Sequence, residues 1–522
     1  MKKGFVVLIL ACILIQQVCA QPSNPSMKTA MARSYFPHCA HYEIFMRSFS
    51  DANGDGIGDL KGITAKWDYL HLLGVESIWL TPVFPSPSYH KYDVTNYYDI
   101  DKDYGTLELF PMFVKDAHKQ GFKIIMDLPL NHCSVKHPWF MEAVKNPKSE
   151  YRNYFLWTEN PPAQDKDHWH LPKDDKGVTV GKEYYYGYFG PEMPDWNYDN
   201  PKVVDEAKKI VSFWLKTGNV DGFRMDAAQH IFPEHAKNVA FWKAIRNTCD
   251  SINPNTFIVA EVGNTSEVIA PYLTSVNACF DFDLSNEILT LLKNEDASSL
   301  NHRVEKIQAN YLSQNKKFDD AIFLTNHDQN RLMTELKGNV EKAKLAAAIL
   351  FTLPGDPFIY YGEEIGMLGQ KPDEHIREPM LFSAAASDKM RPKWINATYS
   401  TDKTVTPVDA QLLDSKSLLV RYKELLQMRK GVRALMVGNF ESSALNSKQL
   451  LAYYRIYNNQ QCLVLHNVSA TKKSITVTDK EKAFSTVVYQ TAKEITFEGD
   501  KINLPPYSSV ILLKPVVTPA TK

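Results

Sequence analysis

The sequence has few cysteines and no excess of charge of either sign. Only 7 of its 522 residues are Cys. Those beyond residue 20 are scattered and odd in number, so we expect no disulfide framework. Lys and Arg total 59 against 60 Asp and Glu, so no strong field draws the protein to nucleic acid or to an anionic membrane. A neutral ligand fits this balance better.

Long apolar runs are also missing, apart from one at the start of the chain. Two lysines precede the run FVVLILACILI, and VCA follows it ahead of Gln21. The run is too short to cross a bilayer, and this layout is typical of a cleavable signal peptide, here residues 1–20. A lipoprotein signal at Cys19 is the alternative, which the bulky Val18 before it disfavours. We expect an exported protein, periplasmic or extracellular, without a transmembrane segment.

Short apolar runs alternate with longer helical patterns through most of the chain. Strands that alternate with helices pair in parallel through right-handed crossovers, and eight such units predict a closed (β/α)8 TIM barrel. The last barrel helix is expected at residues 415–430. The expected strands lie within residues 41–49, 77–84, 123–132, 221–227, 256–262, 279–284, 321–328 and 356–364.

Two parts of the chain depart from a plain barrel. Residues 133–204 are dense in Trp, Tyr, Pro and Asp and are too long for an ordinary loop, so we expect an inserted domain after the third strand. Past residue 435, β-type segments such as LLAYYRIYN and QCLVLHNV predict a C-terminal antiparallel β-sandwich domain at residues 436–517. The barrel then takes residues 38–132 and 205–432.

Carboxylates gather where the expected strands end. Asp226, Glu261 and Asp328 each follow an apolar run, and a barrel places its chemistry at these strand ends. Glycosidic bond cleavage needs one carboxylic acid and one carboxylate on opposite sides of the sugar. Arg224 lies on the same strand face as Asp226 and would hold it ionised as a nucleophile. Glu261 follows the apolar FIVA, whose desolvation suits a general acid.

The run of motifs then resembles a known family. DLPLNH, GFRMDAAQH, EVGN and FLTNHD occur in this order, with MPDWN in the insertion. They resemble the signatures of α-amylases, members of the large α-glucan-acting glycoside hydrolase family (glycoside hydrolase family 13). The match runs from about residue 38 to the C-terminus.

The resemblance implies a role for each matching residue. Asp226 would be the nucleophile, Glu261 the acid/base and Asp328 the stabiliser of the transition state. Contacts with the sugar or the nucleophile are implied for His132, Arg224 and His327. Tyr92 matches an aromatic that stacks on the sugar, and Asp93 with Arg377 matches a pair that closes the non-reducing side.

The expected activity is retaining endo-hydrolysis of α-1,4-glucosidic bonds in starch, maltodextrin and related α-glucans, by a monomer. Gln229 and Trp196 depart from the usual second and fifth signatures, so bond preference stays open. The alternative is a 4-α-glucanotransferase or a neopullulanase or oligo-1,6-glucosidase-like enzyme with the same catalytic residues. A non-catalytic glucan-binding protein is disfavoured because all three carboxylates are present.

The stretch DANGDGIGDL at residues 51–60 places oxygen-bearing side chains at alternate positions. An EF-hand would also need Glu at loop position 12, where this chain has Gly62, and a helix where we expect a strand. The loop resembles the calcium loop of the family's close relatives, so we expect Ca²⁺ as a structural cofactor, against the alternative of a solvated turn. The expected ligands are Asp51, Asn53, Asp55, Asp59 and the carbonyl of Ile57.

Overall fold

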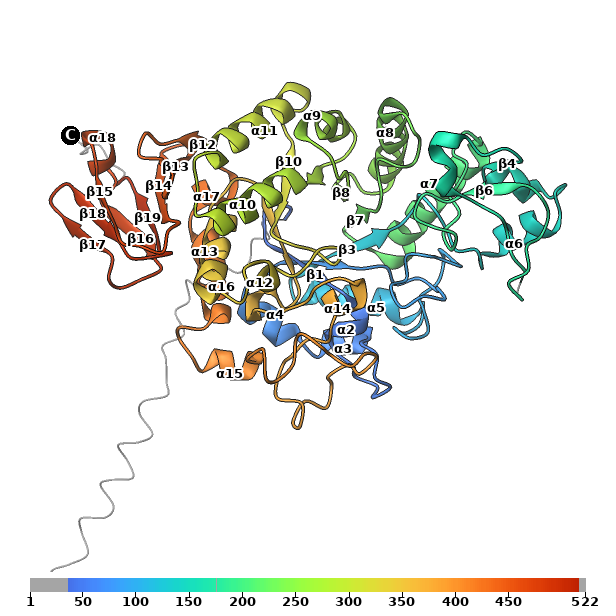
Figure 1. The fold of residues 1–522 in the computed structure, drawn as a ribbon, viewed down its shortest axis with the longest axis horizontal. Helices are drawn as coiled ribbons and strands as arrows, with labels where there is room; N and C mark the ends of the chain where they lie inside the picture. Colours follow the sequence, from blue (N-terminus) through green and yellow to red (C-terminus); the bar gives the residue numbers. More distant parts are fainter. Residues whose placement is uncertain (1–35, 175, 516–522) are drawn as a thin grey trace, which may run out of the picture. The chain divides into compact units, whose positions relative to one another are not determined.

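A computed structural model describes residues 36–174 and 176–515, and the expected signal peptide lies outside them. Eight parallel strands close into a barrel, in the order β1-β2-β3-β7-β8-β9-β10-β11 (Figure 1). This confirms the predicted (β/α)8 fold. The strands are β1 (His41–Ile44), β2 (Ser77–Leu80), β3 (Lys123–Leu128), β7 (Gly222–Met225), β8 (Phe257–Ala260), β9 (Ala278–Phe280), β10 (Asp319–Phe323) and β11 (Asp356–Tyr360).

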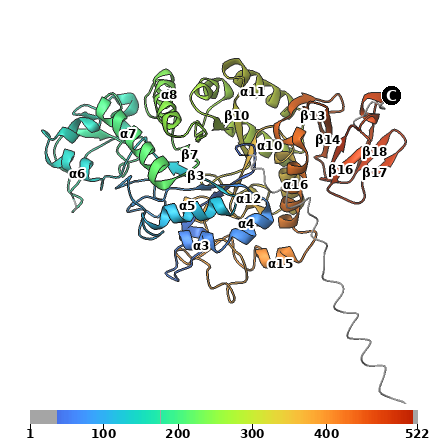
Figure 2. The same ribbon diagram turned by 180° about the vertical axis from the view of Figure 1, so that it is seen from behind.

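Helices surround the barrel strands in both views (Figures 1 and 2). The longer helices are α4 (Trp67–Leu73), α5 (Leu109–Lys119), α7 (Pro201–Phe213), α8 (His235–Ile252), α10 (Phe282–Asn294), α11 (Leu300–Gln314), α13 (Val340–Leu350) and α16 (Leu418–Gly431). Shorter ones are α2 (Met46–Phe49), α3 (Leu60–Thr64), α9 (Ser266–Ile269), α12 (Leu332–Glu335), α14 (Asp373–Ile376), α15 (Val408–Leu412) and α17 (Arg433–Val437).

Side chains fill the inside of the barrel because alternate strand residues point to opposite faces. One buried cluster consists of Trp79, Ile125, Phe257, Val259, Ala278, Phe280, Ala321, Phe323 and Phe358. The intervening residues, such as Ile124 and Met126, belong to the larger core shared with the helices. The barrel is therefore a packed core, and only its rims are open to a ligand.

The first apolar run forms less strand than the sequence predicts. Strand β1 ends at Ile44, and the next residues form the single turn of α2. Met46 and Phe49 are both buried, and their spacing of three suits a helical turn rather than a strand. The predicted strand at 279–284 is shortened in the same way, because Asp281 caps α10 by accepting the Leu284 N–H at 2.8 Å.

The insertion between β3 and β7 folds around aromatic side chains. It contains α6 (Pro138–Lys145) and a three-stranded sheet in the order β4-β6-β5, with β4 (Trp157–Thr158), β5 (Trp169–His170) and β6 (Tyr184–Tyr186). Phe140 packs against the rings of Phe155, Trp157 and Tyr185. A β-bridge between His132 and Asp195 joins the end of this segment to the loop after β3.

The C-terminal segment is antiparallel, as predicted. One sheet has the order β12-β13-β14-β19-β16 and the other β15-β18-β17. In Figure 1 these strands lie beside α11 and α17; α11 contacts β12 and β13, and α17 contacts β13 and β14. The elements are β12 (Asn439–Ser442), β13 (Leu450–Tyr457), β14 (Gln460–Asn467), β15 (Lys473–Thr476), α18 (Asp479–Lys482), β16 (Thr486–Gln490), β17 (Thr496–Glu498), β18 (Lys501–Leu504) and β19 (Ser509–Leu513). In the part of the chain that the structure describes, no helix has the length and apolarity to span a membrane.

Candidate active site

The side chains predicted for catalysis lie together at the C-terminal rim of the barrel. Arg224 is on β7, and Asp226 follows the end of that strand. Glu261 follows β8 directly, and Asp328 lies in the loop after β10. Parallel strands of a barrel end at the same rim, so the fold alone brings together residues that are about a hundred positions apart.

Arg224 is the group around which the carboxylates are arranged. Its side chain is 1% exposed. Nη1 donates to Asp226 Oδ1 at 2.6 Å and to Asp127 Oδ1 at 2.8 Å, while Nη2 donates to Glu261 Oε2 at 2.7 Å. Asp226 and Glu261 therefore bind the two ends of one planar guanidinium and lie side by side.

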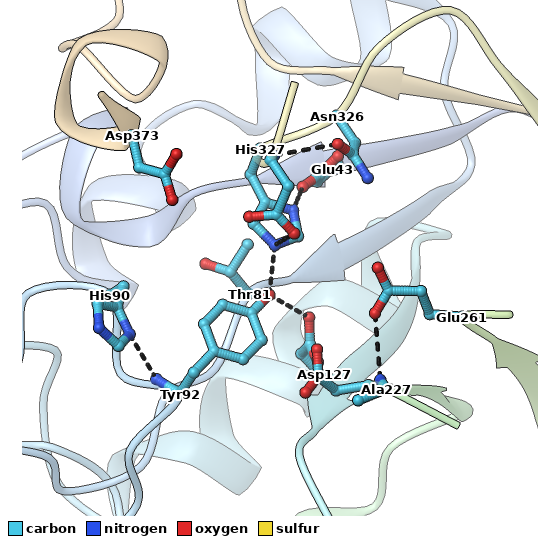
Figure 3. Close-up of polar contacts among 12 residues, drawn as sticks. Glu43, Thr81, His90, Tyr92, Asp127, Ala227, Glu261, Asn326, His327 and Asp373 are labelled. Atoms are coloured by element: carbon cyan, nitrogen blue, oxygen red, sulfur yellow. Dashed lines mark hydrogen bonds and ion pairs between the residues drawn. The ribbon is translucent and has the colours of Figure 1, made fainter. Parts of the chain in front are cut away.

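Arg224 contacts three carboxylates at once, and burial of these carboxylates favours retention of a proton in the cluster. Burial raises the pKa of Glu261 and that of Asp226, with Arg224 opposing the shift in both cases. Burial also raises the pKa of Asp127 to about 7. Glu261 Oε1 has no hydrogen-bond partner among the described residues, whereas Oε2 also accepts the Ala227 N–H at 3.1 Å (Figure 3). Oε1 is thus free to carry a proton toward a substrate.

Asp328 lies close enough to this pair to act on the charge of both carboxylates, and it stays ionised. Burial would raise its pKa, but His327, Arg377 and Arg224 lower it to about 2. Arg377 Nη2 donates to Asp328 Oδ1 at 2.7 Å. The Asp328 side chain is 42% exposed, so its second oxygen can reach a ligand.

Tyr92 and His327 connect the two sides of the site. Their rings stack with centroids 5.5 Å apart, and the Tyr92 hydroxyl lies 2.6 Å from His327 Nε2 and donates to Asp127 at 3.0 Å (Figure 3). His327 Nδ1 contacts Glu43 of β1. Burial would lower the pKa of His327, but Asp328 and Glu43 raise it overall.

His132 lies at the junction of the barrel and the insertion. Burial lowers its pKa to about 4, so the imidazole is neutral at neutral pH. Its Nε2 is buried and has no hydrogen-bond partner among the described residues. A neutral ring nitrogen of this kind can bind a sugar hydroxyl.

Asp93 and Arg377, the two residues expected at the non-reducing side of the site, contact different side chains in the structure, and their role there stays a prediction. Asp93 accepts hydrogen bonds from Ser86, at 2.6 Å, and from Ser88. Arg377 instead contacts Asp328 and, at 3.1 Å, Asp373. The physical reason is that Arg377 lies in the loop after β11 next to these carboxylates, while the serines already satisfy Asp93.

Other residues of the site were not predicted. Glu43 holds His327, Asp127 holds Arg224, and Tyr89 accepts a hydrogen bond from Arg377 Nη1 at 3.0 Å. Tyr89 also stacks on Trp394, with ring centroids 5.1 Å apart. The sequence could have indicated Glu43, which is the one acidic residue in an apolar run, and Asp127, which lies in the motif DLPLNH. No sequence pattern points to Trp394.

The loop at residues 51–60 forms a series of tight turns. Asp51 accepts two backbone N–H groups, at 2.6 and 2.8 Å, Asp55 accepts the Ile57 N–H at 2.8 Å, and Asp59 caps α3 at 2.8 Å. Their oxygens and that of Asn53 keep lone pairs for a cation, and an all-oxygen donor set fits calcium. Within the described residues the three carboxylates do not form a group with oxygens inside 4.8 Å, so an ion would have to draw them together.

The fold and the rim define the class of protein. A barrel with an acid and a carboxylate side by side and a third carboxylate facing them is built for glycoside hydrolysis. Residues 43–438 match the family model described as alpha amylase, catalytic domain. Residues 450–511 match the one described as alpha-amylase SusG C-terminal domain. The chain belongs to the α-amylase family and is a glycoside hydrolase.

Similar proteins cover nearly the whole chain. "Alpha-amylase 3" of Dictyoglomus thermophilum is 40% identical over 92% of this chain and 94% of its own. A "4-alpha-glucanotransferase" of Thermotoga neapolitana is 34% identical over 82% of this chain and 95% of its own. The solved structure of an alpha-amylase from H. orenii has a TM-score of 0.83 at 39% identity, over 91% of this chain and 99% of its own.

Proposed function

We propose that the protein is a retaining endo-hydrolase of α-1,4-glucosidic bonds in starch and maltodextrin. The observation that carries this proposal is the shared guanidinium of Arg224, which sets Asp226 and Glu261 side by side. Asp328 lies close enough to act on the charge of both. The similarity to proteins named alpha-amylase supports the choice of substrate.

The geometry suggests a two-step mechanism. Asp226 attacks the anomeric carbon while Glu261 protonates the leaving oxygen, which gives a covalent glycosyl-enzyme. Glu261, now ionised, takes a proton from water, which then attacks the same carbon and restores the α configuration. Asp328 stabilises the positive charge that develops on the sugar ring in both transition states.

An open aromatic wall supports action within long chains. Tyr188 and Phe189 of the insertion are 36% and 43% exposed. Their rings lie 4.1 Å and 5.6 Å from that of His230, in the loop after β7, and Phe189 lies 5.3 Å from His132. Aromatic faces stack on glucose units, so this wall would bind sugars beyond the one that is cleaved.

The same wall also favours a second candidate, transfer to a sugar acceptor. An apolar surface beside the acid/base disfavours bound water and favours a stacked sugar, and one relative is named as a glucanotransferase. Incubation with maltoheptaose and with pullulan separates the candidates. We expect only shorter maltodextrins; products longer than maltoheptaose would establish transfer, and panose from pullulan would establish neopullulanase-type activity.

The 51–60 loop is proposed to bind one structural calcium ion through Asp51, Asn53, Asp55, Asp59 and the Ile57 carbonyl. At a free concentration one hundred times its dissociation constant, the ion would add about 2.7 kcal/mol of stability. We predict that adding calcium to chelator-treated protein raises the melting temperature of the wild type and hardly that of Asp55→Ala. Activity should survive calcium removal wherever the protein remains folded.

Two outcomes would contradict the calcium proposal. The first is a melting temperature that does not respond to calcium. The second is immediate loss of activity on calcium removal in fully folded enzyme, since that would place the ion in the chemistry. Exposed Asp199→Asn is a suitable control, because this carboxylate is remote from the loop in sequence and 72% exposed.

The protein is further proposed to be exported and monomeric. The support for export is the N-terminal layout of residues 1–20 in the sequence. We expect the mature protein to be found outside the cytoplasm with Gln21 as its first residue. In size-exclusion chromatography with light scattering, we expect the mass of a single chain. An intact N-terminus on the natural protein, or a concentration-independent dimer, would contradict these two proposals respectively.

A further inference from the structure

A second polar cluster lies at the opposite end of the barrel from the active site. Asp319 and Asp356 are the first residues of β10 and β11, and His38 precedes β1. His38 Nδ1 lies 3.4 Å from Asp319 Oδ1 and 3.5 Å from Asp356 Oδ1. Each residue offers one ligand atom, and the three atoms lie within 4.8 Å of one another; in the part of the chain that the structure describes, this is the one group of its kind.

The distances in this cluster are longer than those of strong charge-assisted hydrogen bonds. Charge-assisted N–H···O bonds are about 2.7–2.9 Å long, so His38 is too far from either carboxylate to form a strong one. A tetrahedral metal with ligands at about 2.0–2.2 Å holds its ligand atoms about 3.3–3.6 Å apart. Both His38 contacts fall in this second range.

The Asp356 carboxylate provides an independent indication of a missing ligand. Its side chain is 3% exposed, and Oδ2 has no hydrogen-bond partner among the described residues. Arg429 is close enough to act on its charge, but that guanidinium donates to the carbonyls of Phe351, Leu353 and Gly355. A buried carboxylate oxygen without a hydrogen-bond partner is costly, and a bound cation would reduce that cost.

The cluster is also accessible and joined to a packed segment. The side chains of His38 and Asp319 are 37% and 14% exposed, so an ion can enter from solvent. Just before His38, Phe36 packs edge-on against Phe257 and His41 inside the barrel base. An ion bound here would link the segment before β1 to β10 and β11, the last two strands of the barrel.

We propose that His38, Asp319 and Asp356 form a structural site for a divalent transition metal of the zinc type. One imidazole and two carboxylates suit zinc, with a fourth position open to water. Calcium is disfavoured because it requires six or more oxygen ligands. The site lies at the strand ends remote from Asp226 and Glu261, so the ion acts on stability and not on the chemistry.

The test uses the full mature chain after removal of metals by a chelator, with excess calcium present so that the 51–60 loop is not available to zinc. Zinc is added, unbound metal is removed by gel filtration, and the metal content is measured. We expect one equivalent in the wild type and in the control His302→Ala, which replaces an exposed histidine of α11. His38→Ala and the nearly isosteric Asp319→Asn should retain none.

Thermal melting provides the second readout. Without zinc, all four proteins should have similar melting temperatures. Zinc should raise the melting temperature of the wild type and of His302→Ala by a few degrees and should not change that of His38→Ala or Asp319→Asn. A simple ion pair would instead lower the zinc-free melting temperature of His38→Ala and give no response to zinc. Equal zinc binding by wild type and His38→Ala, or no binding by the wild type, would overturn the proposal.

Discussion

Asp226→Ala and Glu261→Gln are each expected to lower kcat on maltopentaose by about 10³-fold or more. Asp226 supplies the attacking oxygen and Glu261 the proton for the leaving group, and loss of such a group costs orders of magnitude in rate. In each variant Arg224 keeps Asp127 and the other carboxylate as partners, so no buried charge is left unpaired and the melting temperatures should change little. Retention of more than a few per cent of activity in either purified variant would refute the assignment.

The two roles can be separated with α-maltosyl fluoride, whose leaving group needs no acid, and with azide as an external nucleophile. In Asp226→Ala, azide should attack from the face that the carboxylate has vacated and give the β-glycosyl azide. In Glu261→Gln, azide should attack the glycosyl-enzyme and give the α-glycosyl azide. Glu234→Gln, which replaces a 59% exposed carboxylate paired with Lys237, serves as the matched control and should behave as wild type. The opposite pattern of anomers would show that Glu261 is the nucleophile and Asp226 the acid/base.

Arg224→Gln is expected to abolish activity and, unlike the carboxylate variants, to destabilise the fold. Its side chain is buried among Asp127, Asp226 and Glu261, and glutamine removes a positive charge that contacts all three. Removal of one partner from a buried ion pair costs about 3–5 kcal/mol. The free energy of unfolding in urea should fall by an amount of this order.

The control for Arg224→Gln is Arg303→Gln, whose partner Asp283 lies 3.2 Å away at the surface. Surface ion pairs contribute only about 0–1 kcal/mol, so this variant should keep both its stability and its activity. If Arg224→Gln had the same free energy of unfolding as the wild type, the carboxylates of the site would be able to lose their charge at no cost in stability. The arrangement around the guanidinium would then not be the basis of catalysis.

The barrel and the rim carboxylates could be predicted because each strand carries its own signal. A run such as FIVA is apolar on both faces and forms a buried strand. Glu261 follows this run directly, so it lies at the C-terminal rim of the barrel. The helical turn of Met46–Phe49 was harder to predict, because four residues are too few to show a helical period within an apolar run. Only the packing of the barrel floor and loops decides between a strand and a turn.

Contacts between distant segments could not be predicted from local patterns. Glu43 and His327 are brought together by the closure of β1 against the last strands. The contact of Arg377 with Asp328 depends on the positions of the loops after β10 and β11. The group of His38, Asp319 and Asp356 is the extreme case, since each residue reads alone as an ordinary strand boundary. Such contacts form only when the barrel closes and brings these distant segments together.

The central claim is direct attack by Asp226 on the sugar, and the anomer released first tests it most directly. Retaining enzymes place the two carboxyl groups about 5–5.5 Å apart, which leaves no room for the water that an inverting enzyme uses. The shared contacts of Asp226 and Glu261 with Arg224 fit that close spacing. Proton NMR of maltopentaose hydrolysis, recorded before mutarotation, should show the α-anomer of the new reducing end first. Initial release of the β-anomer would contradict the proposed mechanism.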